Sequence, residues 1–217
     1  MTEPTPQPAD AASQIDFWFD FGSNYSHISV MRIEQEATKR NVKIVWTPFL
    51  LGPIFQSFGW NTSPFVLYKQ QGAYMWKDMA RQCAKYGVPW KQPTVFPRRA
   101  VLPLRVALIG ADQPWIGEYC KKIMLLNFVA DRDINASETV AEALADLGLP
   151  ADEIIELAQS EQNKLRLREN TESAQALGIF GAPTFFVRGE MFWGNDRLDD
   201  ALDFATRRIN QWRDLGA

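Results

Sequence analysis

The pattern of apolar and polar positions predicts a strand–helix–strand unit near the start of the chain. Apolar side chains alternate over residues 15–21, with three phenylalanines on one face, and residues 42–48 are rich in β-branched side chains. Between them, residues from Ser23 to about Arg40 have the apolar spacing of a helix. A helix between two strands in so short a span predicts a parallel pair joined by a right-handed crossover.

The strand pattern disappears after residue 48, and helical segments follow one another as far as residue 178. Turn signals built from Gly and Pro separate these segments. The predicted helices are residues 64–86, 98–110, 115–131, 137–147 and 151–178, with Ser137 as a candidate cap of the fourth. A run of helices without strands predicts an all-helical insertion.

Strand patterns return near the end of the chain. Residues 184–188 and 191–193 flank the turn Gly189-Glu190 and predict a hairpin, and a last helix is predicted over residues 197–213. The order β-α-β, helices, α-β-β-α predicts an α/β chain with a thioredoxin-like fold and an inserted all-helical domain. The predicted parts are a disordered tail (1–14), a discontinuous thioredoxin-like domain (15–48 and 171–217) and a helical insertion domain (49–170).

Charge and hydropathy argue against two classes of function. The 217 residues include 23 basic and 26 acidic side chains, a net charge of −3, and no basic run that predicts a nucleic-acid surface. No apolar run approaches about 18 residues, so no membrane span is expected. Residues 1–14 have neither the apolar core of a secretory signal nor the basic character of a transit peptide.

The few thiols and imidazoles narrow the chemistry further. Neither Cys83 nor Cys120 belongs to a Cys-x-x-Cys pair, and two such thiols fit a reduced, cytoplasmic protein, although a disulfide between them remains open. The single histidine, His27, leaves little material for a zinc site, so no metal is expected. We expect His27 to pack or to lie at the surface in preference to acting as a general base.

The junction between the first strand and the first helix carries Ser23-Asn24-Tyr25-Ser26, where a thioredoxin-type oxidoreductase carries Cys-x-x-Cys. With serine at both cysteine positions, dithiol exchange is not expected. A serine hydroxyl at a helix N-terminus can donate to a thiolate and lower the pKa of a thiol brought by a ligand. The alternative is that Ser23 is an ordinary N-cap. Ser26 is expected to be structural.

Gly181-Ala182-Pro183-Thr184 lies directly ahead of the third predicted strand. A proline at this point of a thioredoxin fold is cis and faces the start of the first helix, although most X-Pro bonds are trans. Because Pro183 removes one ladder donor, the backbone edge of Ala182 is left to pair with an extended peptide. Together, Ser23 and Pro183 favour a site for a thiol-bearing peptide.

Gly194-Asn195-Asp196-Arg197 opens the last predicted helix. Asp196 can accept from an ammonium group, and Asn195 with the helix N–H groups can hold a carboxylate. The alternative is that Asn195 or Asp196 only caps the helix.

Several motifs in the same order resemble those of one family. They are the strand with Ser-x-Tyr-Ser, Leu51-Gly52-Pro53-Ile54-Phe55, the turn from Trp60 to Phe65, Gly181-Ala182-Pro183-Thr184, and Phe192-Trp193-Gly194-Asn195-Asp196-Arg197. From about residue 15 to its end, the chain resembles the bacterial 2-hydroxychromene-2-carboxylate isomerases, which are related to kappa-class glutathione transferases.

The resemblance implies a glutathione-dependent isomerase acting on a small aromatic substrate, and a homodimer. In the family's pattern, Ser23 bonds the glutathione sulfur, Ala182 before Pro183 pairs with the cysteinyl unit, Asn195 and Asp196 hold the γ-glutamyl end, and Asn61 lies near the glycyl end. The substrate is expected between the sheet and the insertion, near Trp60, Arg99 and Arg105, and Arg105 keeps the family's arginine for pairing with a substrate carboxylate.

Two positions depart from the family's pattern: Asn24 stands where proline is common, and Arg99 stands where asparagine is frequent. The Arg99 departure leaves the exact substrate open. Two other functions fit the same residues, namely a glutathione transferase or peroxidase, and a non-catalytic peptide-binding module that uses the free strand edge.

Overall fold

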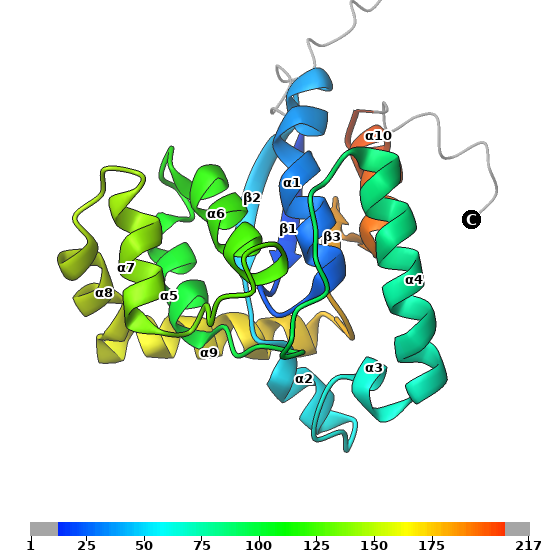
Figure 1. Cartoon of the computed structure of the whole chain (residues 1–217). Coiled ribbons are helices and arrows are strands. Elements are labelled where there is room, and N and C mark those ends of the chain that lie inside the picture. Colours follow the sequence, from blue (N-terminus) through cyan, green and yellow to red (C-terminus); the bar gives the residue numbers. More distant parts are fainter. Residues whose placement is uncertain (1–12, 207–217) are drawn as a thin grey trace, which may run out of the picture.

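A computed structural model, which describes residues 13–206, has a four-stranded mixed sheet at its centre (Figure 1). The strands are β1 (Gln14–Phe19), β2 (Lys43–Pro48), β3 (Thr184–Val187) and β4 (Glu190–Trp193), in the order β2-β1-β3-β4. β1 pairs in parallel with β2 and antiparallel with β3, and β3 pairs antiparallel with β4. The predicted parallel pair and hairpin are confirmed.

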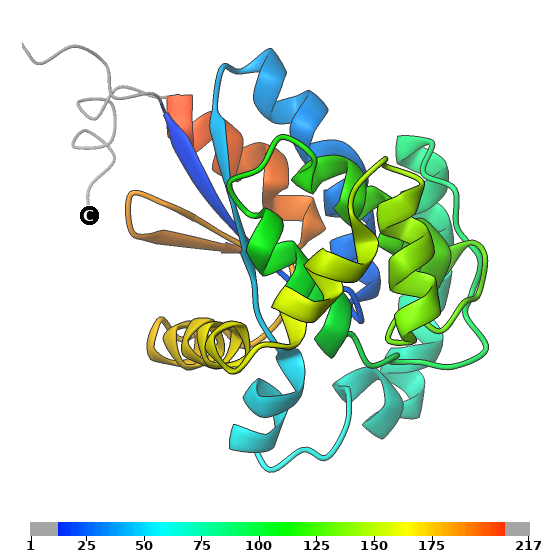
Figure 2. The ribbon, with the colours of Figure 1, turned by 90° about the vertical axis from the view of Figure 1, so that its left-hand side faces the viewer.

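Helices cover both faces of the sheet. α1 (Asn24–Lys39) and α10 (Leu198–Thr206), which follows the short 3-10 helix η1 (Asn195–Arg197), lie on one face. α9 (Glu161–Ala176) lies on the opposite face (Figure 2). The alternation in β1 explains the two layers, because Phe17 and Phe19 point to the α1 side whereas Trp18 packs in the cluster that contains Ala174 of α9.

The remaining helices come from the insertion. They are α2 (Leu51–Ser57), α3 (Pro64–Leu67), α4 (Lys69–Tyr86), α5 (Val101–Gly110), α6 (Ile116–Phe128), α7 (Ser137–Ala145) and α8 (Ala151–Gln159). In Figure 1, α4 lies on one side of α1 and α5 to α8 lie on the other, while α2 and α3 extend beyond the end of β2. The insertion therefore wraps around the end of the sheet where β1 and β2 finish.

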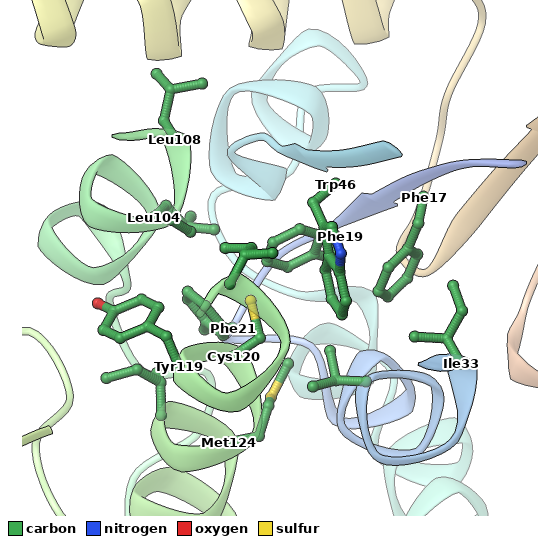
Figure 3. Packing of buried hydrophobic residues seen from close by; sticks show 14 of the residues in the cluster. Phe17, Phe19, Phe21, Ile33, Trp46, Leu104, Leu108, Tyr119, Cys120 and Met124 are labelled. Carbon is green, nitrogen blue, oxygen red and sulfur yellow. The ribbon is translucent and has the colours of Figure 1, made fainter. Parts of the chain in front are cut away.

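One hydrophobic core joins the sheet to the insertion. Figure 3 shows Phe21 beside Tyr119 and Cys120 of α6, with Phe19 of β1 between Phe21 and Phe17. The rings of Phe21 and Tyr119 meet edge to face with centroids 6.2 Å apart. Because these side chains are fully buried together, the insertion shares its core with the sheet.

Several predicted boundaries were wrong. α2 was not predicted, and the helix expected over residues 64–86 breaks at Tyr68, whose backbone is extended. The break lets α3 fold back on α4, where a Cβ on Gly72 would lie only 2.1 Å from the carbonyl oxygen of Phe65. The helix expected over 151–178 breaks at Ser160, whose hydroxyl caps α9 by accepting from the Asn163 amide.

Smaller differences concern caps and ends. Ala136, not Ser137, is the N-cap of α7, and no side chain caps it. The hairpin turn is Arg188-Gly189, with φ of 53° and 87°, so Glu190 already belongs to β4. Gln14, assigned to the tail, opens β1, and the predicted domain boundary after residue 170 falls inside α9. Residues 1–12 of the predicted tail and 207–213 of the predicted last helix lie outside the described residues.

Both cysteines are buried and free, so the disulfide left open by the sequence does not form. Within residues 13–206, no helix has both the length and the apolar character needed to cross a membrane.

Candidate functional site

A cleft of about 1230 Å³ opens where β1 and β2 end, between the sheet and the insertion. Its lining comes from stretches within residues 20–25, 50–56, 61–65, 71–82, 96–101, 180–182 and 193–197. The cleft thus brings together Ser23, Asn61, Arg99, Ala182, Asn195 and Asp196, which the sequence had singled out separately. Carboxyl ends of parallel strands are a common place for ligand sites in α/β folds.

Ser23 lies at the head of α1 and faces the segment before β3. Its hydroxyl accepts from the Ser26 amide at 3.2 Å, which makes it the N-cap of α1, and donates to the Ala182 carbonyl oxygen at 2.8 Å. The Ala182-Pro183 peptide bond is cis, as expected from the sequence. Ser23 is therefore an N-cap and a cleft group at the same time, and its proton must leave Ala182 before it can be donated to a ligand.

Asp20, which sequence reasoning missed, is buried directly beneath this turn. Its two carboxylate oxygens accept from the amides of Gly22 at 2.7 Å and Leu51 at 2.8 Å, so it ties the Ser23 turn to the start of α2. Burial raises the pKa of Asp20 to about 6, against the two backbone hydrogen bonds, which lower it. The sequence feature that could have revealed Asp20 is an acidic residue between two phenylalanines at the end of an apolar strand.

The wall opposite this turn is held by Arg98 and Asn127. Arg98 pairs with Asp131 and donates to both side-chain and backbone oxygens of Asn127. Asn127 in turn donates to the Phe21 carbonyl oxygen at 2.9 Å. A Cβ on Gly22 would lie 2.8 Å from the Arg98 carbonyl oxygen, so only glycine permits this close approach.

Asn195 and Asp196 form the far end of the cleft but have different roles there. Asn195 is buried, and its Oδ1 accepts from Ser29 Oγ and from Arg32 Nη1, both at 3.2 Å. Only its NH2 group is left for a ligand. Asp196 has a largely exposed carboxylate, 3.0 Å from Arg197.

Trp60, Arg99 and Arg105, which were expected near a substrate, lie in different places in the structure. Arg99 is exposed in the cleft and has no ion pair or hydrogen bond with any described residue. Trp60 does not line the cleft; it packs among Phe55, Phe58 and Tyr68.

Arg105 does not line the cleft either. It faces a second pocket of about 630 Å³ beside α9, near Glu161, and burial lowers the pKa of its guanidinium. Arg105 is thus separate from the cleft that contains Ser23 and Arg99, and its pairing with a substrate carboxylate stays a prediction.

His27 lies outside the cleft, in the core. Its Nε2 is 2.9 Å from the Pro89 carbonyl oxygen and its ring packs on Phe128. Burial lowers the pKa of His27 to about 4, so the imidazole is neutral near pH 7. The expectation of packing is confirmed, and Ser26 is likewise fully buried away from the cleft.

The cleft also contains groups to which the sequence analysis assigned no role of their own. Tyr25 donates to Asp78 Oδ2 at 2.9 Å, and burial, with Asp78 second, raises the pKa of this phenol. Phe180 and Trp193 pack with ring centroids 4.7 Å apart at the rim, both about half exposed. The local sequence does not predict that these two rings meet, because the β3–β4 hairpin separates them along the chain.

Comparisons with known proteins agree with this fold and site. The sequence model of the DSBA-like thioredoxin domain matches residues 14–204, which defines the class of protein. The 2-hydroxychromene-2-carboxylate isomerase of Sphingobium xenophagum is 31% identical over 190 residues, covering 85% of this chain and 94% of that protein. The chain belongs to the 2-hydroxychromene-2-carboxylate isomerase family, within the DSBA-like thioredoxin-domain proteins.

Two further comparisons extend the likeness. Glutathione s-transferase kappa 2 of Caenorhabditis elegans is 24% identical over 204 residues, which cover 88% of this chain and 90% of that protein. A solved structure of 2-hydroxychromene-2-carboxylate isomerase has the same fold, with a TM-score of 0.81 and 23% identity over 94% of this chain and 100% of its own.

Proposed function

We propose that this protein is a glutathione-dependent enzyme that isomerises 2-hydroxychromene-2-carboxylate or a related intermediate of aromatic catabolism. The observation that carries the proposal is the position of Ser23, whose hydroxyl lies at the head of α1 against Ala182 in a large cleft without a cysteine. Membership of the isomerase family supports the reaction class.

The polar groups of the cleft fit a thiol tripeptide. Ser23 would hold the sulfur, the segment Ala182-Pro183 the cysteinyl unit, Asn195 and Asp196 the γ-glutamyl end, and Asn61 the glycyl end. The exposed Asp196 carboxylate suits an ammonium group, and the free NH2 of Asn195 suits a carboxylate. When bound, glutathione supplies the nucleophilic thiolate that the cleft does not contain.

The chain's own part is to keep that sulfur ionised. The first N–H groups of α1 have no intrahelical acceptors, and the N-terminus of a 16-residue helix favours an anion. The Ser23 hydroxyl adds a donor once it turns from Ala182 to the sulfur. Both effects favour the thiolate and lower the thiol pKa.

The substrate side of the cleft is supplied by Arg99 and by aromatic rings. The unpaired Arg99 guanidinium suits the carboxylate of a chromene carboxylate. Phe65 and Phe96 also line the cleft and provide apolar walls for a flat ring. This arrangement supports a small aromatic carboxylate as the substrate class.

The proposal is tested by following 2-hydroxychromene-2-carboxylate spectroscopically with and without catalytic amounts of glutathione. We expect turnover only with glutathione, and no loss of total thiol, because an isomerisation returns the thiol. Stoichiometric loss of thiol would contradict the isomerase and favour the second candidate.

That second candidate is a glutathione transferase, which the similarity to the kappa-class protein favours. It is assayed by conjugation of chlorodinitrobenzene, which consumes one thiol for each product formed. Activity there together with inactivity toward the chromene would decide for the transferase.

A further inference from the structure

Asn24, the first residue of α1, has a carboxamide that the fold does not use. The residue lines the cleft beside Ser23 yet is only 2% exposed. Its Nδ2 is enclosed and has no acceptor among the described residues. Its Oδ1 also has no hydrogen-bond donor among the described residues, but unlike Nδ2 it is not fully enclosed.

An enclosed N–H donor without an acceptor is unfavourable, because it has lost its water and gained nothing in return. The position does not need a polar side chain for local reasons. Proline is favoured at the first position of a helix, and the cap of α1 comes from Ser23. Because the enclosed Nδ2 is out of a ligand's reach in this conformation, the carboxamide can serve a ligand only after it turns.

We propose that Asn24 donates a second hydrogen bond, beside that of Ser23, to the thiolate of bound glutathione. This inference rests on the proposed function and adds a residue to the sulfur site. A half-turn about the Cβ–Cγ bond exchanges Oδ1 and Nδ2, and this torsion is soft and roughly two-fold. The half-turn brings the NH2 group to the cleft.

The sulfur site needs such a donor because Ser23 has only one proton to give. In the structure that proton is bound by the Ala182 carbonyl oxygen at 2.8 Å, while the Ser23 oxygen accepts from the Ser26 amide. A thiolate that enters a partly enclosed cleft loses hydrogen bonds to water, and donors of the protein must take their place. Hydrogen bonds to an ionised acceptor are stronger than those between neutral groups. An amide NH2 adjacent in sequence to Ser23 meets that need.

The test is the pKa of glutathione's thiol when bound, measured from the ultraviolet absorbance of the thiolate as a function of pH. We expect Asn24→Ala and Asn24→Pro each to raise this pKa by about 1 unit, a tenfold change in the ionisation constant. Asn24→Pro keeps a residue suited to the first helical position, so both variants are expected to fold. Ser26→Ala, which removes a buried hydroxyl outside the cleft, is the matched control and should leave the pKa unchanged.

Binding of S-methylglutathione, which cannot form a thiolate, separates the sulfur contact from other contacts. We expect wild-type protein and Asn24→Ala to bind it within about twofold of each other, since Asn24 acts only on the ionised sulfur. An unchanged thiol pKa in both Asn24 variants, or an equal loss of S-methylglutathione binding, would overturn the inference while leaving the proposed function intact. A wild-type protein that holds no glutathione thiolate would overturn both.

Discussion

At the scale of single residues, two short polar side chains organise the cleft. Ser23 joins the head of α1 to Ala182, and Asp20 joins the same turn to α2 through two backbone amides. Ser23 acts through a proton that can be redirected, whereas Asp20 acts through a buried charge that has no ion-pair partner among the described residues. Replacing Ser23 should therefore change activity, whereas replacing Asp20 should change how stability depends on pH.

Replacing Ser23 by Ala removes a donor to the proposed thiolate as well as the N-cap of α1. We expect the isomerase kcat/KM to fall about a hundredfold, the size of losing one preorganised donor, and stability to fall by about 1 kcal/mol. Ser23→Asp is the matched variant, because aspartate still caps a helix but repels an anion. No bound thiolate is the expected result for Ser23→Asp, and retained activity there would contradict the role.

The raised pKa of Asp20 links stability to pH. Because its folded pKa is about 6 and its reference value is 3.8, the folded protein binds this proton more tightly than the unfolded chain. The contribution of Asp20 to the free energy of unfolding is fully present below about pH 3.8 and is lost as the pH rises through 6. The free energy of unfolding changes by about 3 kcal/mol over this range.

Urea unfolding of wild type and Asp20→Asn at a series of pH values measures this contribution. Asp20→Asn lacks the titrating carboxyl group. On acidification, the free energy of unfolding of wild type should therefore rise relative to that of the variant, by about 3 kcal/mol. Parallel pH profiles for the two proteins would contradict the burial argument.

At the scale of elements, the cleft walls depend on close backbone approaches that sequence patterns do not reveal. α3 lies against α4 because Gly72 has no side chain, and the residue 96–99 segment approaches the Ser23 turn because Gly22 has none. Neither glycine has a positive φ, so each is required for space and not for backbone conformation.

We expect Gly72→Ala to push α3 from α4 and to destabilise the protein by about 1–3 kcal/mol, the usual cost of overpacking. Because Phe65 of α3 lines the cleft, the proposed binding of glutathione should weaken as well. Gly52→Ala in α2 is the control, since a Cβ there meets nothing within 4 Å and alanine is the better helix former. Thermal unfolding of both variants measures the contrast, and equal midpoints would contradict it.

At the scale of the whole molecule, one core spans the sheet and the insertion. Phe21 packs on Phe19 of β1 and on Tyr119 of α6, and its carbonyl oxygen accepts from Asn127. A core shared in this way predicts that the sheet and the insertion unfold together.

Replacing the buried Phe21 by Ala should cost about 3–5 kcal/mol and still leave a single transition. The far-ultraviolet circular dichroism and tryptophan fluorescence curves are expected to coincide. Leu157→Ala on the exposed side of α8 serves as a control expected within about 0.5 kcal/mol of wild type. Two separated transitions in the Phe21 variant would show that the insertion folds independently.

Much of the fold was predictable, because strand alternation, helical spacing and Gly/Pro turns are local properties. The break at Tyr68 was not, since the residues around it are compatible with one helix, and the close approach of Gly72 to Phe65 is seen only in the structure. Ser23 and Ala182 were expected together because the order of strands and helices brings them to one end of the sheet. Asp20 was missed because burial of a carboxylate within an apolar strand end is a tertiary property.

The sequence by itself determined the order of elements and the absence of cysteine at positions 23 and 26, because these follow from residue identity and local spacing. Only the tertiary structure decided that Arg99 lies in the cleft while Arg105 faces another pocket, and that the Asn24 carboxamide is enclosed without a partner. The physical reason is that the packing of segments distant in sequence sets which side chains face the cleft. That packing determines which of the candidate side chains a ligand can reach.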